Sequence, residues 1–135
     1  MKQLERFHLH LEQIILLGTM VCVALPGCMT RRAHPVDAAR ARQTLQNVLE
    51  SWQRGDSPSQ WRKLSPAVVI QDVDWQAGRL LESFTLVGNG TARDANLYCQ
   101  VKLTFADEST GPQEKMVMYV VGTDPVLTVF RDMMQ

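Results

Sequence analysis

Histidine is scarce in this chain, and its positions exclude several kinds of catalytic site. The sequence holds 3 histidines, and His8 and His10 precede an apolar N-terminal run, which leaves His34 alone in the rest of the chain. A Ser–His–acid relay needs a histidine beside its nucleophile, and a histidine-based zinc site needs several histidines close together. We therefore expect neither kind of site, and we expect no bound cofactor.

The chain also lacks an excess of charge of either sign. It has 14 Lys and Arg residues against 14 Asp and Glu residues, so its formal net charge is zero. A protein that binds nucleic acid is expected to show a basic patch or stripe. Beyond the pair Arg31 and Arg32 the sequence shows no such cluster. The composition therefore predicts no nucleic-acid partner.

Cysteine is rare too, with Cys22, Cys28 and Cys99 as the 3 examples. Cys22 lies inside the apolar N-terminal run and Cys28 follows it, so Cys99 stands alone in the body of the chain. A disulfide framework needs pairs of cysteines. We therefore expect the domain to be stable through its hydrophobic core, with Cys99 as a buried and unreactive thiol.

The sequence has no apolar run of the length usual for a membrane-spanning helix. Residues 14–25 carry no charge, but a spanning helix needs about 20 apolar residues, whereas the apolar part of a secretory signal needs about 7–15. Lys2 and Arg6 supply the positive charge expected ahead of that part. The pattern predicts a secretory signal, with an uncleaved membrane anchor as the alternative.

The end of the run, Leu25-Pro26-Gly27-Cys28, resembles the lipobox of bacterial lipoproteins, with a Leu three residues before a cysteine and a small residue directly before it. The resemblance covers residues 1–28. It implies that the signal is cut before Cys28 and that the Cys28 thiol carries a diacylglycerol. A thiolate is a good nucleophile for this alkylation. The domain would then lie outside the cytoplasm, held by lipid on the cell membrane or the outer membrane.

These boundaries divide the chain into a signal peptide at residues 1–27, a tether at residues 28–36 and a folded domain at residues 37–135. Removal of the signal from the 135-residue chain leaves 108 residues, which is the size of one ordinary domain. The two basic and two acidic residues of the signal cancel, so the mature part is also neutral.

Two helices are expected at the start of the domain. Apolar residues recur at helical spacing over residues 36–54, which predicts a long amphipathic helix with one face in a core. Ser57-Pro58-Ser59-Gln60 has the form of a capping box with proline in the first helical position. It predicts a one-turn helix over residues 61–64.

Strand patterns follow the helices. Apolar residues alternate with polar ones most regularly at 96–106, and the predicted strands are 79–87, 96–106, 114–121 and 126–131, with a preceding piece at 68–70. Turn residues at 75–78 and 88–90 are expected to form turns or loops. Strands joined by short loops favour an antiparallel meander, because parallel strands need long crossover connections.

The predicted fold class is α+β: one long amphipathic helix plus a short helix packed on a curved four-stranded antiparallel sheet. In element order, residues 36–132 resemble the cone-shaped fold of nuclear transport factor two-like and cystatin-like proteins. The resemblance implies a sheet that wraps round the first helix, often with a pocket between them. Some SnoaL-like members are isomerases, dehydratases or cyclases that use Asp, His or Tyr in this pocket, and others have no chemistry.

A few side chains are candidates for such a pocket. Asp72 and Asp74 flank Val73 and at strand spacing would point to the same side, as a general-base pair or a weak calcium site. The alternative is that these carboxylates are solvated or cap a turn. Tyr98 is the third candidate, although a buried tyrosine hydroxyl more often serves structure. The three tryptophans, Trp52, Trp61 and Trp75, are expected to fill the core and not to form a ligand surface.

Two hypotheses of function follow. The favoured one is a membrane-tethered, non-catalytic envelope lipoprotein whose small domain binds another envelope protein or has a structural role. The other is a pocket protein that binds or transforms a small apolar compound, with Asp72, Asp74 or Tyr98 lining the pocket. A cavity of several hundred cubic ångströms that encloses one of these groups favours the second hypothesis.

Overall fold

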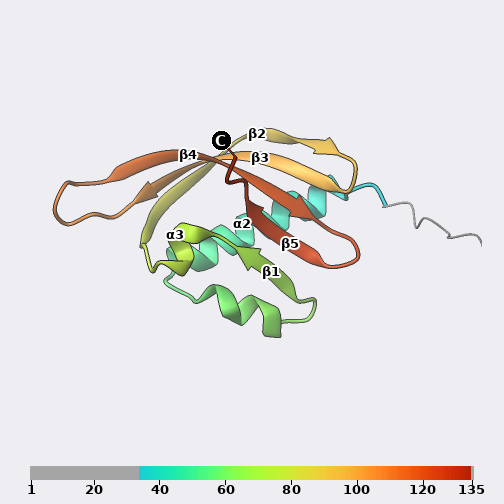
Figure 1. Cartoon of the computed structure of the whole chain (residues 1–135), viewed down its shortest axis with the longest axis horizontal. Helices are drawn as coiled ribbons and strands as arrows, with labels where there is room; N and C mark the ends of the chain where they lie inside the picture. Colours follow the sequence, from blue (N-terminus) through green and yellow to red (C-terminus); the bar gives the residue numbers. More distant parts are fainter. Residues whose placement is uncertain (1–33, 135) are drawn as a thin grey trace, which may run out of the picture. The chain divides into compact units, whose positions relative to one another are not determined.

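The computed structural model of the chain describes residues 34–134, which are coloured by sequence in Figure 1. The predicted signal at residues 1–27, the lipid site Cys28 and the tether up to residue 33 lie outside the described residues. In chain order the elements are α2 (Ala38–Gln53), the 3₁₀ helix η1 (Pro58–Lys63), β1 (Val68–Gln71), α3 (Val73–Gln76), β2 (Leu81–Arg93), β3 (Asn96–Phe105), β4 (Gln113–Gly122) and β5 (Leu127–Arg131).

The main helix, α2, confirms the prediction made from apolar spacing. Asp37 caps its first turn, because the Asp37 carboxylate accepts a hydrogen bond of 3.0 Å from the backbone N–H of Arg40. The backbone N–H of Asp37 itself donates to Thr123 Oγ1 at 3.1 Å, which ties the start of the helix to the loop before β5. One face of the helix is buried, and its buried residues are Ala41, Thr44, Leu45, Val48, Leu49, Ser51 and Trp52.

The five strands form one open sheet in the order β1-β5-β4-β3-β2. Strands β2 to β5 are paired antiparallel, as the meander prediction required, whereas β1 pairs with β5 in parallel. The domain is therefore α+β, with one main helix packed on a five-stranded mixed sheet. The predicted four-stranded, wholly antiparallel sheet is wrong.

The error concerns the short segment before α3. In this segment, β1, the residues Val68 and Ile70 are buried. β1 runs parallel to β5, with Val68 opposite Leu127. A parallel pair needs a long connection between its strands. The prediction considered only connections between strands that follow one another in the chain. The long connection between β1 and β5 consists instead of α3, β2, β3, β4 and the loops between them.

Strand β2 is longer than predicted, because Gly88-Asn89-Gly90 is not a turn. These three residues oppose the single residue Cys99, since Val87 pairs with Gln100 and Thr91 pairs with Tyr98. A Cβ atom at Gly90, where φ is +80°, would lie 2.9 Å from the Tyr98 carbonyl oxygen and 3.0 Å from Cys99 Sγ. The segment is therefore a bulge that requires glycine.

The two short helices differ from the prediction, which gave other bounds for the first and did not include the second. The helix η1 begins at Pro58, with Ser57 as its N-cap, three residues before the predicted start. Of the residues expected to form a turn at 75–78, residues 77 and 78 do so, whereas Trp75 and Gln76 belong to the helix α3, which begins at Val73. Because Asp72 caps this helix, α3 is fixed directly after β1.

The core lies between α2 and one face of the sheet, which we call the inner face. It is built from alternate residues of β3, β4 and β5, because side chains of a strand alternate between its two faces. The core cluster contains Trp52 and Trp75, as predicted, and Cys99, which is a free buried thiol. Burial raises the pKa of the Cys99 thiol, so the thiol stays protonated and unreactive. Among residues 34–134, no helix has the length and apolar character needed to cross a membrane.

Candidate functional site

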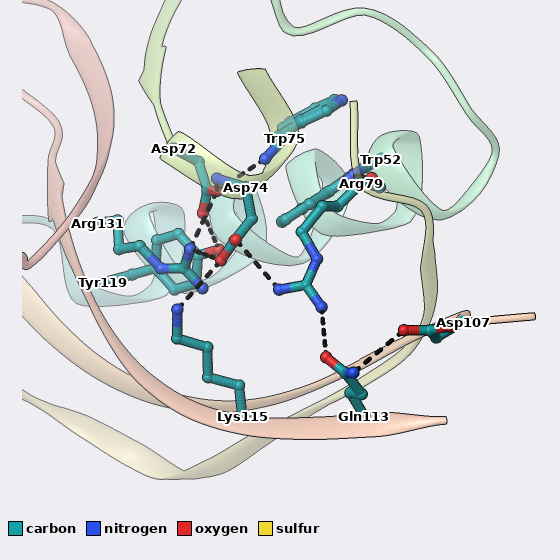
Figure 2. Close-up of polar contacts among 10 residues, drawn as sticks. All are labelled: Trp52, Asp72, Asp74, Trp75, Arg79, Asp107, Gln113, Lys115, Tyr119 and Arg131. Atoms are coloured by element: carbon teal, nitrogen blue, oxygen red, sulfur yellow. Dashed lines mark hydrogen bonds and ion pairs between the residues drawn. The ribbon is translucent and has the colours of Figure 1, made fainter. Parts of the chain in front are cut away.

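Asp72 is the centre of a buried polar network beneath α3 (Figure 2). Its Oδ1 atom accepts hydrogen bonds from the backbone N–H groups of Asp74 at 2.9 Å and Trp75 at 3.0 Å, which caps α3. Its Oδ2 atom accepts a hydrogen bond of 2.6 Å from the Tyr119 hydroxyl. Arg131 Nη1 lies 3.3 Å from Oδ1. Asp72 is 2% exposed, so both carboxylate oxygens are occupied by groups of the chain itself.

Asp74 faces three cations from three parts of the chain. Its carboxylate forms ion pairs with Arg131, with Arg79 at 3.2 Å and with Lys115 at 3.4 Å. Burial opposes ionisation of this carboxyl, but the hydrogen bonds from Arg131 and Arg79 and the nearby positive charges outweigh it. The pKa of Asp74 is therefore lowered from its ordinary value of 3.8.

Arg131 joins the two carboxylates. Its side chain is 3% exposed and comes from the inner face of β5, next to Tyr119 on β4. The Nη1 atom contacts both Asp72 and Asp74, whereas in the described part of the chain its Nε and Nη2 atoms are buried without a hydrogen-bond partner. The arginine is thus held by its ion pairs more than by a full set of hydrogen bonds.

Tyr119 completes the network. Burial, followed by the charge of Asp72 and the hydrogen bond to it, raises the pKa of Tyr119 well above its ordinary value of 10.0. The hydroxyl therefore stays protonated and donates a hydrogen bond to Asp72 Oδ2. The network links α3, β4 and β5 through side chains whose opposite charges compensate one another.

This geometry decides what the Asp72–Asp74 pair can do. The two carboxylates do share one neighbourhood, since Arg131 contacts both. The predicted strand spacing is wrong, because Asp72 caps the helix α3 and Asp74 lies within it. A general base should titrate near the working pH, whereas the Asp74 pKa is lowered. Calcium needs about six to eight oxygen ligands, and among residues 34–134 no group of three or more His, Cys, Asp or Glu side chains is arranged to hold a metal ion. The pair is therefore suited to holding α3 on the sheet.

Tyr98 does not join this network. It lies on the outer face of β3, opposite the core, because its neighbours Leu97 and Cys99 are buried on the inner side. The guanidinium of Arg93 stacks over its ring, with the Arg93 Cζ atom 4.1 Å from the ring centroid. The three predicted pocket residues are thus divided between two faces of the sheet.

A cavity of about 400 Å³ lies elsewhere, where α2 ends. Its lining comes from the end of α2 and the segment after it, and from α3 and the segment before β2. The lining residues are Trp52, Gly55, Asp56, Ser57, Pro58, Trp75, Gln76, Gly78, Arg79 and Leu80. Asp72, Asp74 and Tyr98 are not among them.

Two stacked indoles form the buried side of this cavity. The rings of Trp52 and Trp75 have centroids 5.2 Å apart and an interplanar angle of 7°. Trp75 Nε1, from α3, donates to the carbonyl oxygen of Asp56 at 2.9 Å, and Trp52 Nε1, from α2, donates to that of Arg79 at 2.8 Å. Each tryptophan thus ties its own helix to the opposite wall of the cavity.

Sequence reasoning missed Arg131 as a partner of the aspartates. One signal was available: Leu127, Val129 and Arg131 alternate along β5, so the arginine had to share the buried face of two apolar residues. Tyr119 alternates in the same way with Val117 and Val121. A polar residue in phase with a buried stripe predicts a buried partner, but the partner itself is not identified by spacing.

Comparison with known proteins identifies no family for this chain. The chain matches no protein-family model, no curated protein and no solved structure.

Proposed function

We propose that this protein is a membrane-tethered, non-catalytic lipoprotein of the cell envelope, whose small domain lies outside the cytoplasm and binds an envelope protein or has a structural role. The observation that carries the proposal is Leu25-Pro26-Gly27-Cys28 at the end of an uncharged run preceded by Lys2 and Arg6. Lipid on Cys28 would attach the chain to the membrane, and two or three acyl chains give stable attachment, whereas one gives marginal attachment.

The way the chain enters the domain fits such a tether. The backbone N–H of Val36 donates to the Asp94 carbonyl oxygen, and that of Asp37 donates to Thr123. The tether therefore reaches the domain where the β2–β3 and β4–β5 loops meet the start of α2 (Figure 1). The nine residues 28–36 span about 30 Å at most.

The state of the acidic residues supports a non-catalytic role. Asp72 accepts four hydrogen bonds or ion-pair contacts from the chain, and Asp74 is held ionised by Arg131, Arg79 and Lys115. Carboxylates engaged in this way stabilise a fold and have no free lone pair directed at a substrate.

The cone-shaped fold of nuclear transport factor two-like and cystatin-like proteins is part of the same proposal. A long first helix against one face of a sheet that ends in an antiparallel meander agrees with it. Strands β2, β3 and β4 also bend along their length in Figure 1. The resemblance supplies a scaffold for binding and does not specify a reaction.

A small-molecule ligand is the second candidate, and the cavity beside Trp52 and Trp75 is the observation that favours it. Its volume of about 400 Å³ falls within the range of ligand pockets, about 300–1,000 Å³. An enzymatic form of this candidate required Asp72, Asp74 or Tyr98 in the lining, where none of them is found. Binding without chemistry is therefore the form that the geometry supports.

Mass spectrometry of the mature N-terminus tests the lipoprotein proposal. We expect the membrane fraction of expressing cells to yield an acylated peptide that begins at Cys28. Cys28→Ser should abolish acylation and leave the signal uncleaved, whereas the matched control Cys22→Ser should change neither, because residue 22 lies within the signal. A mature protein with an intact Met1 and an unmodified Cys28 thiol would contradict the proposal.

A further inference from the structure

We propose that the cavity at the end of α2 is a binding site for a small, neutral aromatic molecule. This inference specifies the second candidate function and does not depend on the lipid anchor. Four features of the described residues carry it: the fixed walls of the cavity, its aromatic side, the pairing of its charges and its accessible position.

The cavity is preformed because its two walls are tied across it. One wall is the segment from Gly55 to Pro58, which follows α2, and the other is the segment from Gln76 to Leu80, which follows α3. Trp75 Nε1 holds the first wall through the Asp56 carbonyl oxygen, and Trp52 Nε1 holds the second through that of Arg79. A ligand that enters such a site does not have to order its walls, which reduces the free energy lost on binding.

The aromatic lining favours a planar ring. Trp52 and Trp75, which are 2% and 5% exposed, stack on each other at the base of the cavity. Phe105 is not a lining residue and supports the pair from behind, tilted against Trp52 with ring centroids 5.7 Å apart. Aromatic pairs add a favourable contribution beyond the apolar area that they bury. Pro58 and the exposed Leu80 extend the apolar lining toward the rim. An aromatic ligand therefore gains an aromatic contact with the small exposed part of this pair, which a saturated ring of the same size does not.

The charges in the lining are already paired, which favours a neutral ligand. Asp56 Oδ2 accepts a hydrogen bond from Ser51 Oγ at 2.8 Å and forms an ion pair with Arg54. Arg79 pairs with Asp74, donates to Gln113 Oε1 at 3.0 Å and stacks over Phe105 with its Cζ atom 3.9 Å from the ring centroid. A charged ligand would enter a partly desolvated site in competition with these contacts, at a net cost.

Polar recognition is available at the rim. The side chain of Gln76 is exposed and carries an amide that both donates and accepts hydrogen bonds. The indole N–H groups are not available, since both donate to the walls. We therefore expect the ligand to carry at most one or two polar atoms, placed where its ring meets solvent.

The position of the cavity leaves it accessible. It lies at the C-terminal end of α2, whereas the tether joins the N-terminal end, and a 16-residue helix spans about 24 Å. If the chain is lipidated at Cys28, a tether that spans up to about 30 Å leaves room between the domain and the membrane. A small molecule can therefore reach the cavity whether or not the lipid is present.

Indole titration followed by NMR tests the inference on the full chain, ¹⁵N-labelled and purified in detergent. The indole N–H signals of Trp52 and Trp75 should shift saturably, whereas that of Trp61, which donates to Ser51 Oγ outside the lining, should not. Leu80→Trp fills the cavity mouth and should weaken binding by about tenfold or more, equivalent to about 1.4 kcal/mol. The matched variant Leu64→Trp changes an exposed leucine outside the lining and should leave affinity within about twofold of the wild type.

Two analogues and a second blocking variant complete the experiment. Cyclohexanol and indole-3-carboxylate should bind more weakly than indole, because the first lacks an aromatic ring and the second is charged. Gln76→Trp adds a bulky side chain at the other end of the wall that carries Leu80 and should reproduce the effect of Leu80→Trp, with circular dichroism confirming that both variants fold. Shifts that do not saturate, equal shifts at Trp61, or unchanged affinity in the blocking variants would overturn the inference. These outcomes leave the lipoprotein proposal standing, because it is tested by the mass of the N-terminus.

Discussion

The inner face of the sheet is covered by two helices of very different length, and the two halves are held by different forces. Beneath α2, apolar residues such as Leu45 and Val48 pack in the same cluster as Val101, Val121 and Val129 of the sheet. Beneath α3 lies the network of Asp72, Asp74, Tyr119, Lys115 and Arg131.

Helix length explains the difference. The 16 residues of α2 present a buried stripe along four turns, whereas α3 has four residues, of which Trp75 alone is buried. A single turn is too short to be stable through its own apolar face. Its cap, Asp72, therefore also serves as its attachment to β4 and β5. The comparison predicts that the half under α3 responds to pH and that the half under α2 does not.

Arg131→Met should give the largest effect and test the ionic half directly. Removal of one partner from a buried ion pair leaves the carboxylates uncompensated, and we expect the free energy of unfolding to fall by about 3–5 kcal/mol at pH 7. The Asp74 pKa lies below 3.8 in the fold, so its ion pairs stabilise the protein above about pH 4, and this contribution is lost as the pH falls through the lowered pKa. Urea denaturation at pH 7 and pH 3 measures both effects.

The same measurements identify the cause. The difference between wild type and Arg131→Met should shrink at pH 3, because without Arg131 the pKa of Asp74 is lowered less and the carboxyl of the variant takes up a proton more readily. The double variant Asp72→Asn/Arg131→Met should regain part of the loss at pH 7. A difference that stays constant with pH would show that Arg131 acts by packing alone.

Leu45→Ala tests the apolar half and should cost about 2–5 kcal/mol, because Leu45 is fully buried and its removal leaves a cavity. This loss should be the same at pH 7 and pH 3, since no ionisable group is involved. Thermal or urea denaturation measures it. Leu64→Ala is the matched control, because Leu64 is 52% exposed, and it should change the free energy of unfolding by about 0.5 kcal/mol or less.

Tyr119→Phe should have a smaller effect, about 1–3 kcal/mol, because it removes the hydrogen-bond donor to Asp72 Oδ2 and leaves the ring in place. The folded-state pKa of Tyr119 is raised above 10.0, so the tyrosine stabilises the fold below about pH 10 and loses this contribution at higher pH. The alkaline loss of stability should therefore be weaker in the variant. Tyr98→Phe, on the outer face, is the control and should lower the free energy of unfolding by less than Tyr119→Phe does.

Glu114→Gln should give the smallest loss in the free energy of unfolding, less than about 1 kcal/mol, because both side chains of the Lys102–Glu114 ion pair are exposed. Added salt should remove most of it, since exposed pairs are screened. Denaturation in low and high salt checks this. A loss as large as that of Arg131→Met would erase the distinction between a buried and a surface pair.

Local patterns in the sequence predicted most of the elements. The apolar spacing of α2 and the alternation of β3 are repeated over many residues, so each determines its element with little help from the rest of the chain. The capping role of Asp72 was one of the alternatives that the sequence left open, whereas the strand spacing assumed for Asp72 and Asp74 is wrong, because Asp74 lies in α3.

Non-local choices were not predictable from these patterns. Nothing near Val68 indicates that its partner is Leu127, because that pairing depends on where β5 lies after four other elements have packed. Gly88-Asn89-Gly90 has turn composition, but the hairpin turns at Asp94, where φ is +52°, and the glycines are used for a bulge. The position of Arg131 beside Asp72 depends on the same long-range packing.

The bulge at Gly88–Gly90 also affects how another chain could pair with the free edge of the sheet. β2 is the last strand in the order β1-β5-β4-β3-β2, so its outer edge has no neighbouring strand among the described residues. Exposed edges of this length are templates for aggregation, and a bulge is one of the devices that blunts them. An incoming chain would find the 13-residue edge interrupted after Val87. The bulge therefore makes this edge a poorer template for pairing with the strand of another copy.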